Sequence, residues 1–437
     1  MLARGVPRFF PAGPDRRRRR SRPGPVPAVV RLAGCHGRTI GGAPMPRERD
    51  LLRDPGGPQH VTFLELYFDL VFVFALERVS QGLVDHLRWT DLVETLVLLP
   101  AIWWIWMMTV WMTDRFDPSH PSTQLVVIGI MLVSLVVGAA VPGAFDDASW
   151  IFAGGYVAIQ LGRSLYLTVA LRDRTFRRRG LRTMFWFLIS AVPWLLGAAL
   201  PWGQRLALWT LAVLIDYAAA RLDFPTPGLG RSRTSEWWLA AEHTSERYRQ
   251  IIIIALGGDI LVAGTTFGTR PFGLDSVAAL VVSFSITGLL WRIYIYRAGE
   301  LMSDALAVAE DPAHLGRSAA YTHLLLAAAS VAVAVTAKLV IAAPLVGPHR
   351  SWSAAIIAGP VLFLLGRARL EYTVFSKVAL SRIIGLAAIA ATAPAMLLLP
   401  PLFVAGTMVL ILAGVAAGDV AGWLRNPSVP RPPPRRH

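Results

Sequence analysis

Apolar stretches of about 20 residues recur along most of the chain, and short polar segments separate them. A helix of that length crosses the hydrocarbon core of a bilayer and bonds all of its own backbone polar groups, as lipid requires. The pattern therefore predicts an all-α polytopic membrane protein. We expect about twelve transmembrane helices, with a range of 10–12 because the sixth and tenth are short: 63–83, 92–112, 123–142, 150–171, 183–201, 205–221, 249–267, 275–296, 317–344, 352–367, 378–399 and 401–423.

The first predicted span begins with FLELYFDLVFVFAL and carries two carboxylates, Glu65 and Asp69. An acid at the centre of a membrane helix costs roughly 2.5–3.5 kcal/mol on insertion scales. Residues four apart lie on one helical face, so this face is expected to turn into protein or a wet cavity. Two interpretations stay open: a cation or proton site, or a structural group bonded to a neighbouring helix.

Two arginines inside later spans are the candidate charge partners of these acids: Arg163 in span 150–171 and Arg292 in span 275–296. A buried arginine in a helical bundle usually pairs with a carboxylate. We therefore expect Arg163 or Arg292 to be the nearest permanent positive charge to the acid face. A closed ion pair indicates a structural role, whereas an exposed acid with the arginine elsewhere indicates a site.

The span at 249–267 contains Gly257 and Gly258, followed by Asp259. One interpretation is a discontinuous helix whose free backbone groups meet an ion. The other is a pair of glycines that allows close helix packing. Asp259 is the candidate polar residue on the opposing half of the molecule.

Three polar residues precede that span: His243, Glu246 and Arg247. A structural zinc site needs four ligands, so this group is too small for a metal site on its own. We interpret it as helix capping or an interfacial cluster.

The charge distribution points to a membrane protein rather than to a nucleic-acid-binding one. The chain has 437 residues, 16% of them charged, with a net charge of +15. Soluble domains carry about 25% charged residues. The arginines gather in both tails and in alternate loops, including 172–182 and 222–248, as expected for loops that stay in the cytoplasm. Both termini are therefore predicted to be cytoplasmic, membrane lipids are the expected partners, and no nucleic acid is expected.

These patterns divide the chain into five segments, and two six-helix halves are a hypothesis, because two repeats are common in transporters. The segments are a basic disordered cytoplasmic tail at 1–58, a first transmembrane half at 59–221, a connecting loop at 222–248, a second half at 249–423 and a basic Pro-rich tail at 424–437.

Sequence motifs of common enzymes are absent: we find no Walker loop, no dinucleotide-binding glycine motif, no HExxH and no GxSxG. We therefore predict neither catalysis nor a cofactor. Cys35 is the single cysteine, which excludes an intrachain disulfide and a cysteine-based metal site.

Four stretches carry a resemblance to a known family: FLELYFDLVFVFALERVSQGL, AIWWIWMMTVWMTDRFDP, YVAIQLGRSLYLTVAL and FPTPGLGRSRTSEWWLAAEHTSERYRQIIIIALGGDILV. The chain resembles the bacterial low temperature requirement protein A family, strongly over about 58–300. The resemblance implies a multipass inner-membrane protein named for growth in the cold, with no established reaction, ligand or cofactor. The motif positions that carry over are Glu65, Phe68, Asp69, Gly162, Arg163, His243, Glu246 and Arg247.

One position departs from that family's pattern. The family usually has an acid where this chain has Gly258, and Asp259 follows it. A shift of one residue turns a side chain about 100° around a helix. A role of the family's acid is therefore in doubt here, unless a helix break lets Asp259 compensate.

The leading functional hypothesis is a transporter- or channel-like inner-membrane protein for a small ion or solute, with Glu65, Asp69 and Asp259 near a polar cavity. The alternative is a membrane-stress or cold-adaptation factor that acts through lipids or partners and transports nothing. A lipid-modifying enzyme is a third class, with His60, Glu65, His243 and Glu246 as its candidate residues at headgroup level.

Overall fold

The computed structural model describes residues 51–53, 60–84, 87–170, 174–232, 241–296, 302, 304–306 and 312–425. Most of the N-terminal tail and residues 426–437 lie outside this part of the chain. The expected disorder of these tails therefore stays a prediction.

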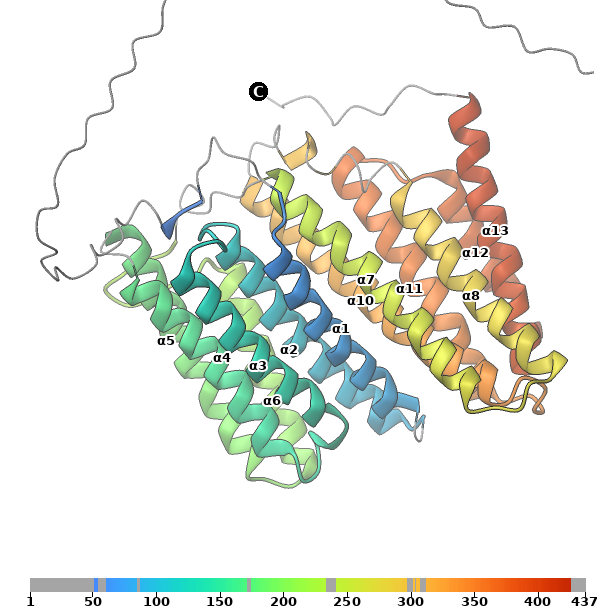
Figure 1. The fold of residues 1–437 in the computed structure, drawn as a ribbon, viewed down its shortest axis with the longest axis horizontal. Coiled ribbons are helices and arrows are strands. Elements are labelled where there is room, and N and C mark those ends of the chain that lie inside the picture. Colours follow the sequence, from blue (N-terminus) through green and yellow to red (C-terminus); the bar gives the residue numbers. More distant parts are fainter. Residues whose placement is uncertain are drawn as a thin grey trace, which may run out of the picture. The chain divides into compact units, whose positions relative to one another are not determined.

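The described residues form helices and no named β-strand, and each predicted span falls on a helix (Figure 1). The main helices are α1 Phe63–Val84, α2 Trp89–Thr113, α3 Pro121–Ala140, α4 Ser149–Val169, α5 Arg174–Ala198, α6 Trp202–Arg221, α7 Ala241–Gly268, α8 Leu274–Ile295, α10 Pro312–Ala342, α11 Arg350–Phe375, α12 Leu380–Met396 and α13 Pro401–Arg425.

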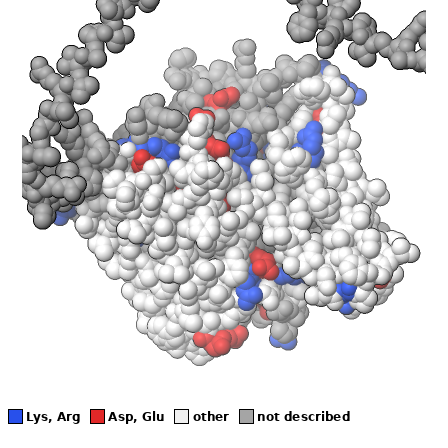
Figure 2. Space-filling model, viewed as in Figure 1, with Lys and Arg blue, Asp and Glu red and all other residues white. Residues whose placement is uncertain are grey.

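Eight of these helices are long and apolar enough to cross a membrane: α2, α3, α5, α7, α8, α10, α11 and α13. The others are shorter or less apolar, and α1 carries four charged residues within its 22. The helical fold class is confirmed, but the count of about twelve spans is not. Large apolar side chains on α3 remain exposed, with Leu125 at 71% and Leu132 at 64%. Figure 2 shows a face that is mostly uncharged, with charged side chains in separate groups, as suits a surface in contact with lipid.

Several boundaries differ from the expectation, because α5 begins at Arg174 instead of 183 and α11 ends at Phe375 instead of 367. Helix α7 begins at Ala241 instead of 249, because His243 and Arg247 are buried among other helices and not solvated in a loop. Residues 51–53, expected in the disordered tail, are held against the end of α2. The backbone N–H of Arg53 donates to the carbonyl of Arg115 at 2.9 Å, and the short segment buries Leu51.

The main helices of the described residues fall into two sets of six, α1–α6 and then α7, α8, α10, α11, α12 and α13, and the two sets share most of their helix contacts. In both sets the first helix contacts the second and third, and the second contacts the sixth. The third, fourth, fifth and sixth helices contact one another in succession. Much of the contact pattern of the first set is therefore found again in the second.

The two sets meet through the helices that begin each of them. Helices α1 and α2 contact α7 and α10, and α1 lies beside α7 and α10 in Figure 1. The centre of α2 is packed on all sides, with Trp103, Trp104 and Trp106 fully buried. Packing therefore accounts for the tryptophan-rich segment of α2. Any polar group on the inner face of α1 is enclosed by helices from both sets.

Candidate functional site

Asp69 lies on α1 in a closed ion pair with Arg247 of α7. The two Nη atoms of Arg247 donate to the two carboxylate oxygens of Asp69 at 2.9 and 2.8 Å, and both side chains are at most 1% exposed. The indole N–H of Trp106 on α2 donates to Asp69 Oδ1 at 2.8 Å. A paired-donor geometry of this kind is the strongest arrangement open to an arginine and a carboxylate.

One turn earlier on the same helices, His243 bridges two carboxylates. Its Nε2 is 2.8 Å from Glu65 Oε1 on α1, and its Nδ1 is 2.7 Å from Asp114 Oδ1 at the end of α2. The hydroxyl of Thr244 also donates to Asp114 Oδ1 at 2.9 Å. Ionised carboxylates only accept hydrogen bonds, so this geometry fits an imidazolium that donates from both nitrogens.

The register of two parallel helices produces both contacts. Glu65 and Asp69 are four residues apart on α1, and His243 and Arg247 are four residues apart on α7. Residues with that spacing share one helical face. The two faces pack against each other in the same register, so Glu65 pairs with His243 and Asp69 pairs with Arg247.

Arg53 covers the outer end of this cluster. Its Nη2 lies 3.7 Å from Glu65 Oε2 and 3.2 Å from His243 Nε2, and it donates to the carbonyl of Thr113 at 3.2 Å. The backbone N–H of Thr62 donates to Glu65 Oε2 at 2.9 Å. The segment before α1 thus closes the site from the end at which α1 and α7 begin.

With His243 protonated, the positive and negative charges of the described residues in this site are equal in number. Three carboxylates and three cations form what we call the interface cluster: Glu65, Asp69 and Asp114 with Arg53, His243 and Arg247. Loss of one proton from His243 would leave a net negative charge in a buried site, which is costly unless the helices or a cation respond.

Glu246 and His60 lie at the edge of the cluster. Glu246 is half-buried; its Oε2 accepts from the backbone N–H of Val61 at 3.3 Å, and its Oε1 accepts from Gln250 at 3.1 Å. His60 offers only its backbone carbonyl, to Arg53 Nη1 at 3.3 Å. Among the described residues, no group of three acidic, histidine or cysteine side chains is arranged to hold a metal ion.

Asp259 lies elsewhere along α7 and has a neutral partner. It is 4% exposed, and the hydroxyl of Ser330 on α10 is 3.1 and 3.0 Å from its two oxygens. A Cβ at Gly258 would stand 2.7 Å from Val73 Cγ1 of α1, so this glycine permits close packing of α7 on α1. Helix α7 is continuous from Ala241 to Gly268, which favours the packing interpretation over a discontinuous helix.

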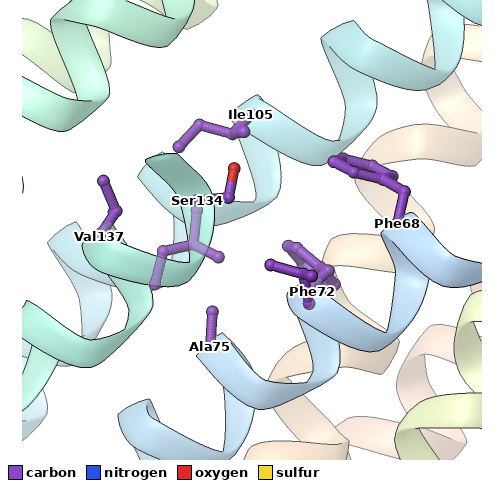
Figure 3. A pocket seen from close by; sticks show the side chains of 8 residues that line it. Phe68, Phe72, Ala75, Ile105, Ser134 and Val137 are labelled. Carbon is purple, nitrogen blue, oxygen red and sulfur yellow. The ribbon is translucent and has the colours of Figure 1, made fainter. Parts of the chain in front are cut away.

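The cavities next to these acids are small. A cavity of about 10 Å³ lies beside Asp259 and Ser330, between α1, α7 and α10. Another of about 10 Å³ lies on the far side of α1, where Phe68 and Phe72 face Ile105 of α2 and Ser134 of α3 (Figure 3). A volume of that size holds about one water at most. The conformation is therefore closed around the acids.

The expected partners of the acids are not the observed ones. Arg163 donates to the hydroxyl of Thr109 at 3.3 Å and to the side-chain carbonyl of Gln160, and Arg292 lies over the ring of Tyr296. The expectation that one of these arginines is the nearest cation to Asp69 is wrong. Arg247 takes that place, because the loop it was assigned to is the first part of α7.

A second buried ionic network, which the sequence analysis missed, joins α11, α12 and α13. Glu371 pairs with Arg367 at 3.3 Å and with Arg382 at 3.1 Å, and Arg382 also donates to Asp419 at 2.9 and 2.8 Å. Arg367 donates to the carbonyl of Ile293 at the end of α8, at 3.0 Å. We call these groups the second-half network.

A signal for that network is present in the sequence. The tripeptide Leu-Gly-Arg occurs four times, at 161–163, 229–231, 315–317 and 365–367. The first and the last of these copies lie on the fourth helix of their set, α4 and α11, and their arginines are at most 1% exposed. Their place on the fourth helix, and not the tripeptide alone, makes Arg163 and Arg367 comparable positions.

The apolar helices and the enclosed charges define a multipass helical membrane protein. The family model for the bacterial low temperature requirement A protein (LtrA) matches residues 60–417. The chain therefore belongs to that family. It is also 30% identical over 368 residues to "Uncharacterized protein RA0937" of Rhizobium meliloti (strain 1021), across 83% of this chain and 88% of the relative.

Proposed function

We propose that this chain is a transporter- or channel-like protein of the bacterial inner membrane, in which the interface cluster is a proton-linked element between two six-helix halves. The supporting observation is the position of His243. It is fully buried and bridges carboxylates on two helices of the first half from the first helix of the second half. Buried ionisable groups within membrane helices are costly, and they commonly mark ion or proton pathways.

The proposed mechanism follows from the charge balance of the cluster. A protonated His243 holds α7 against α1 and α2 by two charge-assisted hydrogen bonds. When the proton leaves, at least one of these bonds is lost and the cluster is left with an unbalanced negative charge. The halves can then separate on this side, or a cation can enter. Asp259, whose observed partner is a neutral hydroxyl, is a further buried protonatable group on α7.

One observation favours the alternative of a cold-adaptation factor that transports nothing. The acids are closed by Arg247 and His243, and the cavities beside α1 have volumes of about 10 Å³. In that case the cluster holds the two halves together, and the protein acts through lipids or partners.

Flux measurements separate these functions. Purified protein in liposomes is given a proton, Na⁺ or K⁺ gradient, and a dye inside that is selective for the same ion reports its entry. We expect flux in the wild type and its loss in His243→Gln, while Arg178→Gln, a change at an exposed position on α5, keeps it. Folded wild-type protein that passes none of the three ions, together with failure of His243→Gln to support growth in the cold, would instead favour the alternative.

The membrane orientation is a further part of the proposal. Arginine-rich loops favour both termini in the cytoplasm. In a Cys35→Ser background, a cysteine placed in 142–149 should react with an impermeant maleimide added outside intact cells, and one in 172–182 should not. The reverse labelling pattern would overturn this orientation.

A further inference from the structure

Three arginines line one cavity at the arginine-rich end of the first half. The cavity has a volume of about 30 Å³ and lies between the end of α2, the end of α4 and the start of α5. Its walls include Arg115, Arg163 and Arg179, with the hydroxyl of Thr183 and the apolar side chains of Met112 and Phe116. We call it the arginine pocket.

Arg163 brings a permanent charge into this pocket, and no carboxylate of the described residues is in contact with it. It is 1% exposed, and its contacts are the hydroxyl of Thr109, the carbonyl oxygen of the Gln160 side chain and the face of the Phe187 ring. Within the described part of the chain, no carboxylate oxygen lies within 4.0 Å of its guanidinium nitrogens. Asp216, on α6, acts on the charge of Arg163 without contacting it, and accepts from the hydroxyl of Tyr156 at 2.7 Å. Arginine stays charged in proteins, so an unpaired buried guanidinium is costly.

The equivalent arginine of the second half is neutralised within the chain. Arg367 pairs with Glu371, four residues later on the same helical face. The residue four positions after Arg163 is Leu167, which also lines the arginine pocket. Each half therefore buries an arginine on its fourth helix, but the first half supplies no acid four residues after it.

We propose that the arginine pocket binds a phosphate group, either as the headgroup of an anionic phospholipid or as a free anion. Guanidinium groups recognise phosphate oxygens by paired hydrogen bonds, and basic pockets between membrane helices bind anionic headgroups. The apolar wall formed by Met112 and Phe116 suits the first carbons of a lipid. The observed volume holds about two waters. Entry of a phosphate therefore requires Arg115 and Arg179, both half-buried at helix ends, to move outward.

This inference is independent of the proposed transport function. Binding of a phosphate group to α2, α4 and α5 requires neither ion flux nor proton transfer by the interface cluster. Failure of either proposal leaves the other standing.

Lipid binding by purified protein is the first test. Wild-type protein in detergent is titrated with phosphatidylglycerol or with phosphatidylcholine, and the bound lipid is counted by native mass spectrometry. We expect phosphatidylglycerol to be preferred, and Arg179→Gln to weaken its binding about tenfold or more, because a hydrogen bond between charged groups is lost. The matched control is Arg178→Gln, at an exposed neighbouring position outside the pocket, which should change binding by about twofold or less.

Leu167→Glu tests the charge argument directly. This change places an acid four residues after Arg163, as Glu371 follows Arg367. An internal carboxylate should compete with the phosphate and weaken phosphatidylglycerol binding about tenfold or more, whereas Leu167→Gln should leave most of the binding intact. Melting curves of both variants establish that they are folded before binding is compared.

Inorganic phosphate distinguishes the two sources of the group. Displacement of phosphatidylglycerol by millimolar phosphate, dependent on Arg179, supports a pocket that also takes the free anion. Displacement by neither phosphate nor sulfate, with lipid binding still dependent on Arg179, supports a headgroup site. Equal phosphatidylglycerol binding by wild type, Arg179→Gln and Leu167→Glu would overturn the proposal.

Discussion

The fourth helices of the two halves, α4 and α11, each bury an arginine, but the groups that contact these two arginines differ. On α11, Arg367 belongs to a network in which Glu371, Arg382 and Asp419 leave each charged group with an opposite one. On α4, Arg163 meets a hydroxyl, an amide oxygen and an aromatic face. Burying a cation without an opposite charge is costly in either half. In the second half the acids of the chain offset this cost, whereas in the first half a bound anion can offset it.

The sixth helices repeat the contrast. Asp419 on α13 accepts from Arg382 and from the hydroxyl of Ser381 at 2.7 Å. Asp216 on α6 accepts from the hydroxyl of Tyr156, and its other oxygen has no hydrogen-bond partner. The helix arrangement is shared, so this difference arises from side chains and not from the backbone. Arg367 and Asp419 of the second half thus contact opposite charges, whereas the described contacts of Arg163 and Asp216 in the first half are with neutral groups.

Asp69→Asn should give the largest effect of the changes proposed here, because it removes the carboxylate that the buried Arg247 contacts. We expect a loss of about 3–5 kcal/mol in the free energy of unfolding. Unfolding by sodium dodecyl sulfate in mixed micelles measures it. The double variant Asp69→Asn with Arg247→Met removes both charges and should recover much of the loss. A single variant as stable as the wild type would show that the pair contributes little to folding.

Glu371→Gln should give an intermediate effect, because it removes the acid four residues after Arg367, and Arg163 has no acid at that spacing either. Arg382 keeps Asp419, and Arg367 keeps the backbone carbonyl of Ile293, so the expected loss is about 1.5–3 kcal/mol. Leu167→Gln at the equivalent helix position removes no charge and should cost about 1 kcal/mol. The same unfolding assay compares the two. Equal losses would mean that neutralisation does not distinguish the halves.

Asp259→Asn should give the smallest effect, and it is the matched control for Asp69→Asn. Its partner is the hydroxyl of Ser330, which can donate to an amide oxygen as well as to a carboxylate. We expect a change of about 1 kcal/mol or less. If Asp259 is also a proton carrier, the variant should lose flux in liposomes while its unfolding curve stays close to that of the wild type. A large loss of stability would reveal a charged partner in the folded protein.

Local patterns in the sequence were enough to place the helices and to orient the acid face of α1. Apolar runs determine where a chain can cross lipid, and a spacing of four places Glu65 and Asp69 on one face. The high cost of an acid in lipid further indicated that this face is enclosed, and Asp69 is indeed fully buried. The family was also recognisable, because its motifs are contiguous stretches of the chain.

The partners of those acids were decided by tertiary structure alone. His243 and Arg247 are 178 residues from Glu65 and Asp69. In the sequence they belong to a polar stretch that is typical of a loop, and only the folded chain shows that α1 and α2 bury them. The distinction between Arg163 and Arg367 likewise depends on which side chains the neighbouring helices bring to each one. Helical periodicity is a local property, so a short stretch of sequence is enough to predict it. Pairing of charges depends on how distant helices pack, and only the folded chain determines that.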